Sequence, residues 1–250
     1  ERRKNREGEL MTSIVIDIGN SATKIYKVTD GNISSTGLYE KDFEGWVKAK
    51  NAPADIIIAS VVPEKTAEIS KSVKKITGKT PFVLKHEHYK TLKSRYIDIK
   101  ELGIDRLCNI AYAVKNYKKN AVVIDFGSAV TFEVINGQGE FEGGMIFPGV
   151  KLQYAALTEH TALLPDLEAE VTDLFIGRST AECIRSGVQN GIAGICNDFV
   201  REFAERLSSR VQIIFSGGDA ELIGKLVDFD FKIETNTVPL GAWIIRNMNR

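Results

Sequence analysis

The sequence predicts an α/β fold built from two similar halves. Two distant stretches, SIVIDIGNSATKIYKV at 13–28 and AVVIDFGSAVTFEVI at 121–135, share one pattern. Each has a β-branched strand, then Asp-x-Gly, a small polar residue and a second β-branched strand. Segments with helical periodicity lie between and after them, and alternating strands and helices are typical of α/β proteins. The repeat therefore predicts a duplicated fold with a cleft between the halves.

Each half also has a turn signal after its second strand. Asp30-Gly31 follows the first pair of strands, and Asn136-Gly137 follows the second. Dipeptides of this kind close β-hairpins. We therefore expect the same hairpin unit in both halves, the first within residues 11–118 and the second within 119–250. Residues 1–10 precede Met11 and are expected to be an extension outside the fold.

Three segments have helical periodicity. Residues 63–77 begin with a proline, which is favoured in the first turn of a helix. A second helix is predicted just after Gly103, with one face made by Ile104, Leu107, Ala111 and Val114. The third, at 179–207, has an apolar stripe of Ile184, Val188, Ile192, Ile195, Phe199 and Phe203. It also contains three glycines that lower helix propensity and so predict close packing against another helix, namely Gly187, Gly191 and Gly194.

Composition excludes several classes of protein. The 250 residues include 33 Lys plus Arg and 33 Asp plus Glu, so no overall basic field draws the chain to nucleic acid or an anionic membrane. Its three cysteines form no C-x-x-C pair, which fits a reducing compartment. No apolar run approaches the roughly 20 residues of a membrane helix. We expect a cytoplasmic protein that binds a small molecule or a second copy of itself.

The first Asp-x-Gly motif has the chemistry of a phosphate site. Gly19 allows a tight turn that brings backbone N–H groups close to an anion, and Asn20, Ser21 and Lys24 supply further donors. Asp17 would repel phosphate unless a hard cation such as magnesium lay between them. Alone, the motif is more often an ordinary turn after a strand. Its repetition favours a site for a nucleotide and a metal ion.

A third glycine motif, IIFSGGDA at 213–220, predicts a strand that enters a helix through Gly217 and Gly218. Such a turn suits close approach of the backbone to a nucleotide, although a plain strand-to-helix turn has the same pattern. The chain has no G-x-x-x-x-G-K-[ST] motif, which excludes a P-loop ATPase.

Asp105 and Arg106 stand at the start of the second predicted helix. An acidic residue in the first turn is commonly electrostatic capping. Beside a phosphate site, Asp105 could instead accept the proton of an attacking hydroxyl, and Arg106 could clamp a substrate carboxylate. Phosphoryl transfer requires such positioning and charge neutralisation. The histidines of His86-Glu-His88 have no clear third ligand, so a metal site there is not expected.

Six motifs in order resemble those of type III pantothenate kinase, and together they span nearly all of residues 12–245. They are Asp17-Ile-Gly-Asn-Ser-x-x-Lys24, Gly103-Ile-Asp-Arg106, Asp125-Phe-Gly-Ser-Ala-Val-Thr131, Gly143-Gly-Met-Ile-Phe-Pro-Gly149, GRST at 177–180 and SGGDA at 216–220. The resemblance implies the superfamily of acetate and sugar kinases, Hsc70 and actin. Its members have two duplicated actin-like (ribonuclease H-like) domains that flank an ATP cleft.

The resemblance also implies ATP-dependent phosphorylation of pantothenate to 4′-phosphopantothenate, the first step of coenzyme A biosynthesis, by a homodimer. Asp105 would be the catalytic base, and Asp125 would bind a monovalent cation, K⁺ or NH₄⁺. ATP and Mg²⁺ would be held by Asp17, Gly19, Asn20, Ser21, Lys24, Ser128, Gly217 and Gly218. Pantothenate would contact Tyr96, Gly103, Ile104, Arg106 and Thr180.

The chain departs from the family pattern in two places. Asp98 and Ile99 stand where the family often has Asn and Pro, so the substrate loop is expected to differ. Ser128 replaces a Thr and keeps the hydroxyl. Two alternatives stay open: a kinase for another small substrate, and a non-enzymatic accessory regulator of transcription on the same fold. Retention of the acidic residues argues against a kinase that has lost its chemistry.

Overall fold

The computed structural model describes residues 12–48, 55–117, 119–172, 174–206 and 210–250. The chain divides into two compact units. The first comprises the residues up to Asn116 together with Asn236–Arg250, and the second is Tyr117–Thr235. The expected extension at 1–10 lies outside the described residues. Residues 236–250 were expected in the second half, but their helix packs within the first unit.

The first unit is built on a sheet with the strand order β3-β2-β1-β4-β5. The strands are β1 Thr12–Ile18, β2 Thr23–Thr29, β3 Asn32–Leu38, β4 Asp55–Ser60 and β5 Phe82–Val83. β1 pairs antiparallel with β2 and parallel with β4. Asp30 and Gly31 have φ of 52° and 76°, as the type I′ turn between β2 and β3 requires. The first predicted hairpin turn is confirmed.

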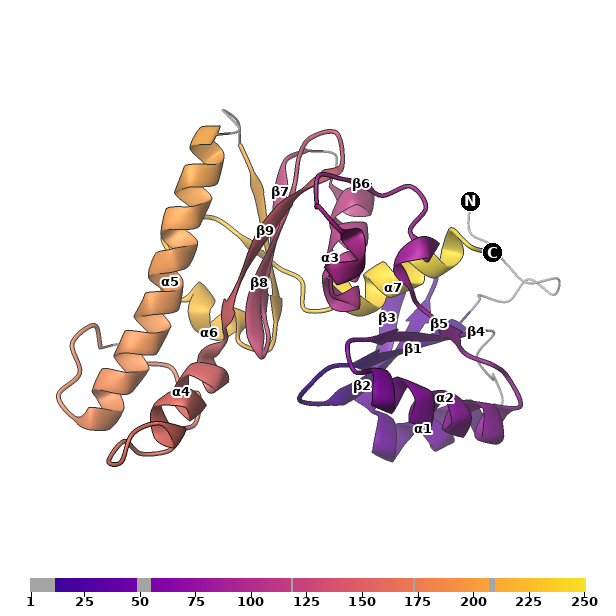
Figure 1. Ribbon diagram of the computed structural model, residues 1–250, viewed down its shortest axis with the longest axis horizontal. Coiled ribbons are helices and arrows are strands. Elements are labelled where there is room, and N and C mark those ends of the chain that lie inside the picture. The colour runs from indigo at the N-terminus through magenta and orange to yellow at the C-terminus, as the bar shows by residue number, and fades with distance from the viewer. Residues whose placement is uncertain (1–11, 49–54, 118, 173, 207–209) are drawn as a thin grey trace. The chain divides into compact units, whose positions relative to one another are not determined.

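Helices lie on both faces of this sheet (Figure 1). They are α1 Tyr39–Lys48, α2 Pro63–Thr77, α3 Ile104–Asn116 and α7 Thr237–Asn247. The short elements between α2 and α3 are the 3₁₀ turns η1 His86–His88 and η2 Ile99–Glu101, and the strand β6 Lys93–Ser94. The helix predicted at 63–77 and the one predicted after Gly103 are both confirmed.

Alternation along β1 decides which side chains face which layer of helices. Ile14, Ile16 and Ile18 pack with residues of α1 and α2 in one apolar core. Because successive side chains of a strand point to opposite faces, Val15 and Asp17 point to the other face. α3 and α7 pack on that face.

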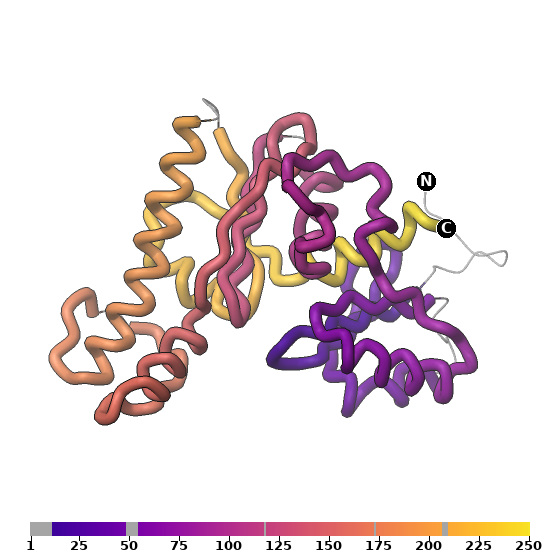
Figure 2. The backbone as a smooth tube through the Cα atoms, in the orientation of Figure 1, coloured from indigo at the N-terminus to yellow at the C-terminus, as the bar shows by residue number. Residues whose placement is uncertain are grey.

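The last helix returns to the first unit and lies beside α3 (Figure 2). The contact is close because Gly241 of α7 has no side chain. A Cβ atom at Gly241 would lie 2.8 Å from the Cα of Cys108 and would overlap its carbonyl group. Both helices are buried at this point. This packing between residues far apart in the sequence explains why 236–250 belong with the first unit.

The second unit has a sheet with the strand order β11-β10-β7-β8-β9. The strands are β7 Ala121–Phe126, β8 Ala129–Ile135, β9 Glu140–Pro148, β10 Gln212–Gly217 and β11 Lys232–Ile233, and the helices are α4 Val150–Glu159, α5 Thr180–Arg206 and α6 Ala220–Gly224. Val122, Ile124 and Phe126 of β7 pack against these helices. Within the described ranges, no helix combines the length and the apolar character needed to cross a bilayer.

The second hairpin turn is longer than its dipeptide signal indicated. The N–H of Asn136 donates to the carbonyl of Glu140 at 3.0 Å, and the left-handed residue is Gly139, with φ of 75°, rather than Gly137. The side-chain oxygen of Asn136 accepts from the N–H groups of Gln138 and Glu140, both at 3.0 Å. Asn136 therefore organises a wider loop that still closes a hairpin.

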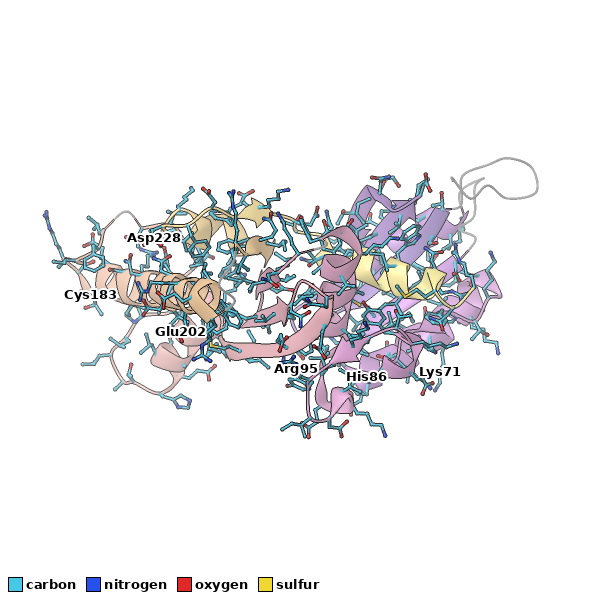
Figure 3. The ribbon with its side chains drawn as sticks, turned by 90° about the horizontal axis from the view of Figure 1, so that it is seen from above. Lys71, His86, Arg95, Cys183, Glu202 and Asp228 are labelled. Carbon is cyan, nitrogen blue, oxygen red and sulfur yellow. The ribbon has the colours of Figure 1, made fainter. Side chains whose placement is uncertain are left out.

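Helix α5 spans nearly all of the segment predicted at 179–207, of which residue 207 lies outside the described part. Ile184, Val188 and Ile192 are buried, as predicted. Ile195 is 43% exposed, however, and Cys196 takes the next core position because the helical repeat of 3.6 residues advances the buried stripe. The exposed side of α5 carries the three glycines and Cys183, which Figure 3 labels.

One prediction concerns the ion cluster that ties α7 to β4. Asp55 accepts hydrogen bonds from Arg246 Nε at 2.6 Å and from Arg250 Nη2 at 3.1 Å. All three side chains are less than one quarter exposed. Asp55→Asn should lower the free energy of unfolding by about 2 kcal/mol, because two partly buried guanidinium groups lose their anion. Urea denaturation measures this loss.

The matched control is Glu44→Gln. Glu44 pairs with Lys48 at 2.9 Å on the surface of α1, where both side chains are mostly exposed. Water already solvates those charges, so the denaturation midpoint should not change measurably. Equal midpoints for Asp55→Asn and the unaltered chain would contradict a stabilising role for the cluster.

Candidate active site

The first group of candidate residues lies at the end of β1. Asp17 pairs with Lys24 across β1 and β2, so their side chains share one face of the sheet. The N–H of Gly19 donates to the carbonyl of Ala22 at 3.1 Å, which leaves Asn20 and Ser21 as an exposed two-residue turn. A half-buried carboxylate, a lysine and a polar turn thus come together at one strand end.

The second group lies at the start of α3. The N–H of Arg106 donates to Asp105 Oδ1 at 2.8 Å, so the carboxylate folds back over the first turn of its own helix. Gly103 leaves room for it, because a Cβ atom there would overlap Asp105 Oδ1. Ile104 is buried, and Arg106 is only 5% exposed. The glycine, the acid and the arginine of the predicted motif are therefore one local unit.

Burial raises the pKa of the Asp105 carboxyl above its ordinary value, while the N–H and the guanidinium of Arg106 oppose the rise. Desolvation disfavours the charged form of an acid, and it is the largest effect here. A carboxylate of this kind is a stronger proton acceptor than an exposed aspartate. That is the property required of a general base.

The thiol of Cys108 is affected by the carboxylates of both groups of residues. Its thiol is fully buried, and burial raises its pKa well above the ordinary value. The negative charges of Asp17 and Asp105 raise this pKa further. Since the interaction between charges weakens with distance, both carboxylates lie near Cys108. The first unit therefore brings Asp17 and Asp105 to the same side of its sheet.

Tyr96 and the departure at Asp98 lie in the segment before α3. The N–H of Tyr96 donates to Ser94 Oγ at 3.0 Å, and the ring is half-buried. Asp98 Oδ1 accepts from the N–H of Lys100 at 2.9 Å and caps η2, which Ile99 begins. An asparagine oxygen could accept the same bond, whereas a proline at 99 would stiffen the start of this turn.

The two histidines have roles within the loop. His86, labelled in Figure 3, lies with Nε2 2.6 Å from the carbonyl of Leu102, and His88 Nδ1 accepts from the N–H of Lys85 at 3.1 Å. The ring of His88 packs on Phe82 with the centroids 4.4 Å apart. In the part of the chain that the structure describes, no three His, Cys, Asp or Glu side chains gather as a metal-binding group.

The repeated motif in the second unit has the same architecture with one residue fewer. The N–H of Gly127 donates to the carbonyl of Ala129 at 3.1 Å, so Ser128 alone makes the turn. Asp125 pairs with Thr131 of β8, where Asp17 pairs with Lys24. On its other side Asp125 pairs with Ser216 of β10. Its neighbours across the sheet therefore carry hydroxyl groups.

Thr131 and Ser216 stand outside the predicted site residues. If residues are counted from Asp125 as in the first motif, its cross-strand partner is placed one residue too late, because the second turn is shorter by one residue. Ser216 lies on the strand of the Gly-Gly motif, and the parallel pairing of β10 with β7 is a long-range contact. The only signal for Thr131 is alternation, which places it on one face with Glu133 of the same strand.

The turn at Gly217 and Gly218 packs against the end of β7. Gly217 has φ of 85°, and a Cβ atom there would lie 2.6 Å from Asp125 Oδ1 and would overlap the carbonyl group of Phe126. The N–H of Asp219 donates to that carbonyl at 3.2 Å. Gly218 has no neighbour within 4 Å of an added Cβ atom. Gly217 is thus required for packing, and Gly218 is open.

Asp219 is a further acidic group that the sequence pattern did not single out. Burial raises the pKa of its carboxyl, and the charge of Lys151 opposes this shift. Ser128 contacts the loop at the end of β9, since the N–H of Gly149 donates to its carbonyl at 2.9 Å. The turn after β7, the loop after β9 and the turn after β10 therefore lie together in the second unit.

Thr180 is not brought to these residues by any contact that we find among the described side chains. It is the first residue of α5, and its side chain is exposed. The preceding Ser179 accepts from the N–H of Glu182 at 3.3 Å, and Glu182 accepts from the N–H of Arg178 at 2.7 Å. This reciprocal pattern is similar to a capping box, and it fixes where α5 begins.

Comparisons with known proteins agree with this chemistry. The family model for type III pantothenate kinase matches residues 13–202. A type III pantothenate kinase from Persephonella marina is 32% identical over 230 residues, which cover 86% of this chain and 90% of that protein.

Two solved structures show the same fold. A Campylobacter jejuni protein described as a Baf family transcriptional activator has a TM-score of 0.58 at 23% identity and covers 94% of this chain and 98% of its own. A Sinorhizobium meliloti protein described as a 2-dehydro-3-deoxygalactonokinase has a TM-score of 0.52 at 12% identity, with 94% and 96% covered. At these identities the likeness concerns the fold alone.

The fold is therefore that of the actin-like kinases, with a duplicated α/β unit, and the chemistry of its strand ends suits phosphoryl transfer from ATP. The family match covers most of the chain and includes the acid at the start of α3. The chain belongs to the type III pantothenate kinase family.

Proposed function

We propose that this chain phosphorylates pantothenate with ATP, and that Asp105 is the general base. The observation that carries the proposal is the arrangement at the start of α3. A half-buried carboxylate with a raised pKa lies on the side of the sheet to which Asp17 of β1 points. The family match supports pantothenate as the substrate, and the geometry supports the proposed roles of the residues.

The polar end of β1 is the proposed site for the ATP phosphates. Lys24 and the turn at Asn20 and Ser21 offer donors to phosphate oxygens, and Gly19 keeps that turn narrow. Asp17 is suited to Mg²⁺, which typically takes one or two carboxylates together with water and substrate phosphates. Bound there, the ion would neutralise charge on the phosphates.

Asp105 is proposed to accept the proton of the pantothenate hydroxyl as the hydroxyl oxygen attacks the γ-phosphorus. The bond between that phosphorus and the bridging oxygen breaks, and ADP leaves with the electron pair. The N–H of Arg106 holds one oxygen of the carboxylate, and the other oxygen is the proposed proton acceptor. Arg106, Gly103, Ile104 and Tyr96 are proposed to bind pantothenate, with the guanidinium facing its carboxylate.

The second unit is proposed to bind the rest of the nucleotide and a monovalent cation. Gly217 and Gly218 would allow close approach to the nucleotide, and Ser128 would contact phosphate. Asp125 is the proposed ligand of K⁺ or NH₄⁺, because its cross-strand neighbours offer hydroxyl oxygens and no positive charge. These oxygens fit a weakly charged cation.

A homodimer is also part of the proposal. The exposed side of α5 carries Gly187, Gly191 and Gly194, and an added Cβ atom at each would meet no neighbour. Such a surface permits close approach of another helix, and Thr180 at the start of α5 would then complete a substrate site. The free thiols of Cys108, Cys183 and Cys196 support a reducing, cytoplasmic location.

The test of the function is ATP-dependent phosphorylation of pantothenate by the purified chain with Mg²⁺. Turnover should require K⁺ or NH₄⁺ and should be low when Na⁺ is the monovalent cation, because the larger ions fit the oxygens around Asp125. Coupled measurement of ADP release gives the rate. No turnover in any of the three salts would contradict the proposal and favour another substrate or a regulatory role.

Asp105→Asn should reduce kcat by about 10²–10⁴-fold, the usual contribution of a general base. ATP binding, measured by calorimetry, should be retained, because an asparagine side chain has a similar shape and the site for the phosphates is elsewhere. Glu101→Gln is the matched control, since this exposed carboxylate lies nearby at the end of η2. Normal turnover in Asp105→Asn would remove Asp105 from the mechanism.

The raised pKa of Asp105 sets the direction of two pH effects. The base must be ionised, so kcat/KM should fall as the pH drops through the pKa of the folded protein, which lies above the ordinary value. The folded chain also binds this proton more tightly than the unfolded chain, so ionisation lowers stability at neutral pH. Asp105→Asn should therefore unfold at a higher urea concentration at pH 7, and the gain should vanish below the unfolded pKa of about 3.9.

Gly217→Ala and Gly218→Ala separate packing from nucleotide binding. Gly217→Ala should destabilise the chain by about 1–3 kcal/mol, because φ of 85° is strained for alanine and its Cβ atom would overlap Phe126. Gly218→Ala should leave stability nearly unchanged and raise the KM for ATP, since only the approach of the nucleotide is obstructed. An unchanged KM in Gly218→Ala would show that the nucleotide does not contact this turn.

A further inference from the structure

The position of Asp105 within the first unit depends on the position of α3. Its carboxylate is held on the first turn by the N–H of Arg106, and Gly103 leaves the space that it occupies. These contacts fix the acid relative to its own helix. Any shift of α3 therefore carries the acid with it.

α7 holds α3 by a contact between backbones. A Cβ atom at Gly241 would overlap the carbonyl group of Cys108 and lie 2.8 Å from its Cα atom. Cys108 lies three residues after Asp105, which is about one helical turn. Because the contact is made by main-chain atoms, no change of the Cys108 side chain would create room for a methyl group at 241.

A buried hydrogen bond fixes the two helices at a second point. Thr237 Oγ1 donates to Asn109 Oδ1 at 2.7 Å, and both residues are fully buried. Thr237 begins α7, and Asn109 directly follows Cys108. Two contacts one turn apart along α7 thus restrict both its rotation and its sliding along α3.

We propose that Gly241 and Thr237 of α7 are positioning residues for phosphoryl transfer, which set the place of the Asp105 carboxylate through the packing of α7 on α3. The inference rests on the proposed function, since it takes Asp105 as the base. Protein interiors are densely packed, so a methyl group inserted at this contact must displace a helix. A misplacement of about 1 Å can reduce catalysis about 100-fold.

Gly241→Ala tests the backbone contact, and Thr237→Val tests the hydrogen bond at nearly constant volume. Gly241→Ala should lower kcat about 100-fold and raise the KM for pantothenate, because α3 carries both Asp105 and Arg106, while the KM for ATP stays within about twofold, because the proposed phosphate site lies at the end of β1. Thr237→Val should lower kcat about tenfold in the same manner. Thr237→Ser keeps the hydroxyl and should restore most of the rate.

Trp243→Leu is the matched control on the same helix. Its ring covers Gly31 in the β2–β3 turn, where an added Cβ atom would lie 3.2 Å from the ring. Trp243 is two residues from Gly241 and so points away from that side of the helix. The variant should unfold at a lower temperature, yet its kcat should equal that of the unaltered chain.

The result that would overturn the inference is a wild-type kcat in folded Gly241→Ala and Thr237→Val, with only their unfolding temperatures lowered, as in Trp243→Leu. If Gly241→Ala does not fold, the comparison of Thr237→Val with Thr237→Ser decides. The unaltered chain and Asp105→Asn are assayed first. Failure there would overturn the proposed function and this inference with it, whereas failure confined to the α7 variants overturns this inference alone.

Discussion

The site depends on the cost of placing a carboxylate at the end of a buried strand. β1 is covered on both faces, so residues 14–16 are apolar and buried, and Asp17 follows them one residue before the strand ends. A charge at that point loses part of its hydration. Lys24 places a positive charge directly across the hairpin on the same face, and the turn at Gly19 leaves the polar end of the strand exposed. The surrounding layers could then pack without burying the charge completely.

Duplication gave the second unit the same strand end with different electrostatics. Removal of one residue from the turn shifts the cross-strand partner, so Asp125 lies opposite Thr131 instead of a lysine. Ser216 adds a second hydroxyl on the other side. The first strand end combines a carboxylate with a positive charge, and the second combines one with neutral oxygens. One architecture therefore offers two different electrostatic environments, which is why we propose different roles for Asp17 and Asp125.

Local chemistry made much of this fold predictable, and long-range packing accounts for the rest. Pro63 and the Asp30-Gly31 turn act within a few residues, so the limits of α2 and the first hairpin followed directly from the sequence. The place of α7 did not, because it depends on Gly241 meeting a residue of α3 far earlier in the chain. Ile195 was misplaced for a related reason. A stripe of apolar residues in the sequence shows which positions of a helix could be buried. In a long helix the buried face rotates along the axis, and this rotation decides which of those residues lie in the core.

The start of α3 shows why the proposed catalytic base would be held by packing rather than by a strong ion pair. A stronger ion pair would keep Asp105 ionised, but it would also lower the pKa and weaken the base. Desolvation raises the pKa, and the backbone N–H groups of Arg106 and Asp105 and the guanidinium of Arg106 oppose it. Ionisation of an acid held in this way lowers stability at neutral pH, so its position must be fixed by other groups. Close backbone packing and a buried hydrogen bond one turn further along the same helix can supply that rigidity without altering the charge of the carboxylate.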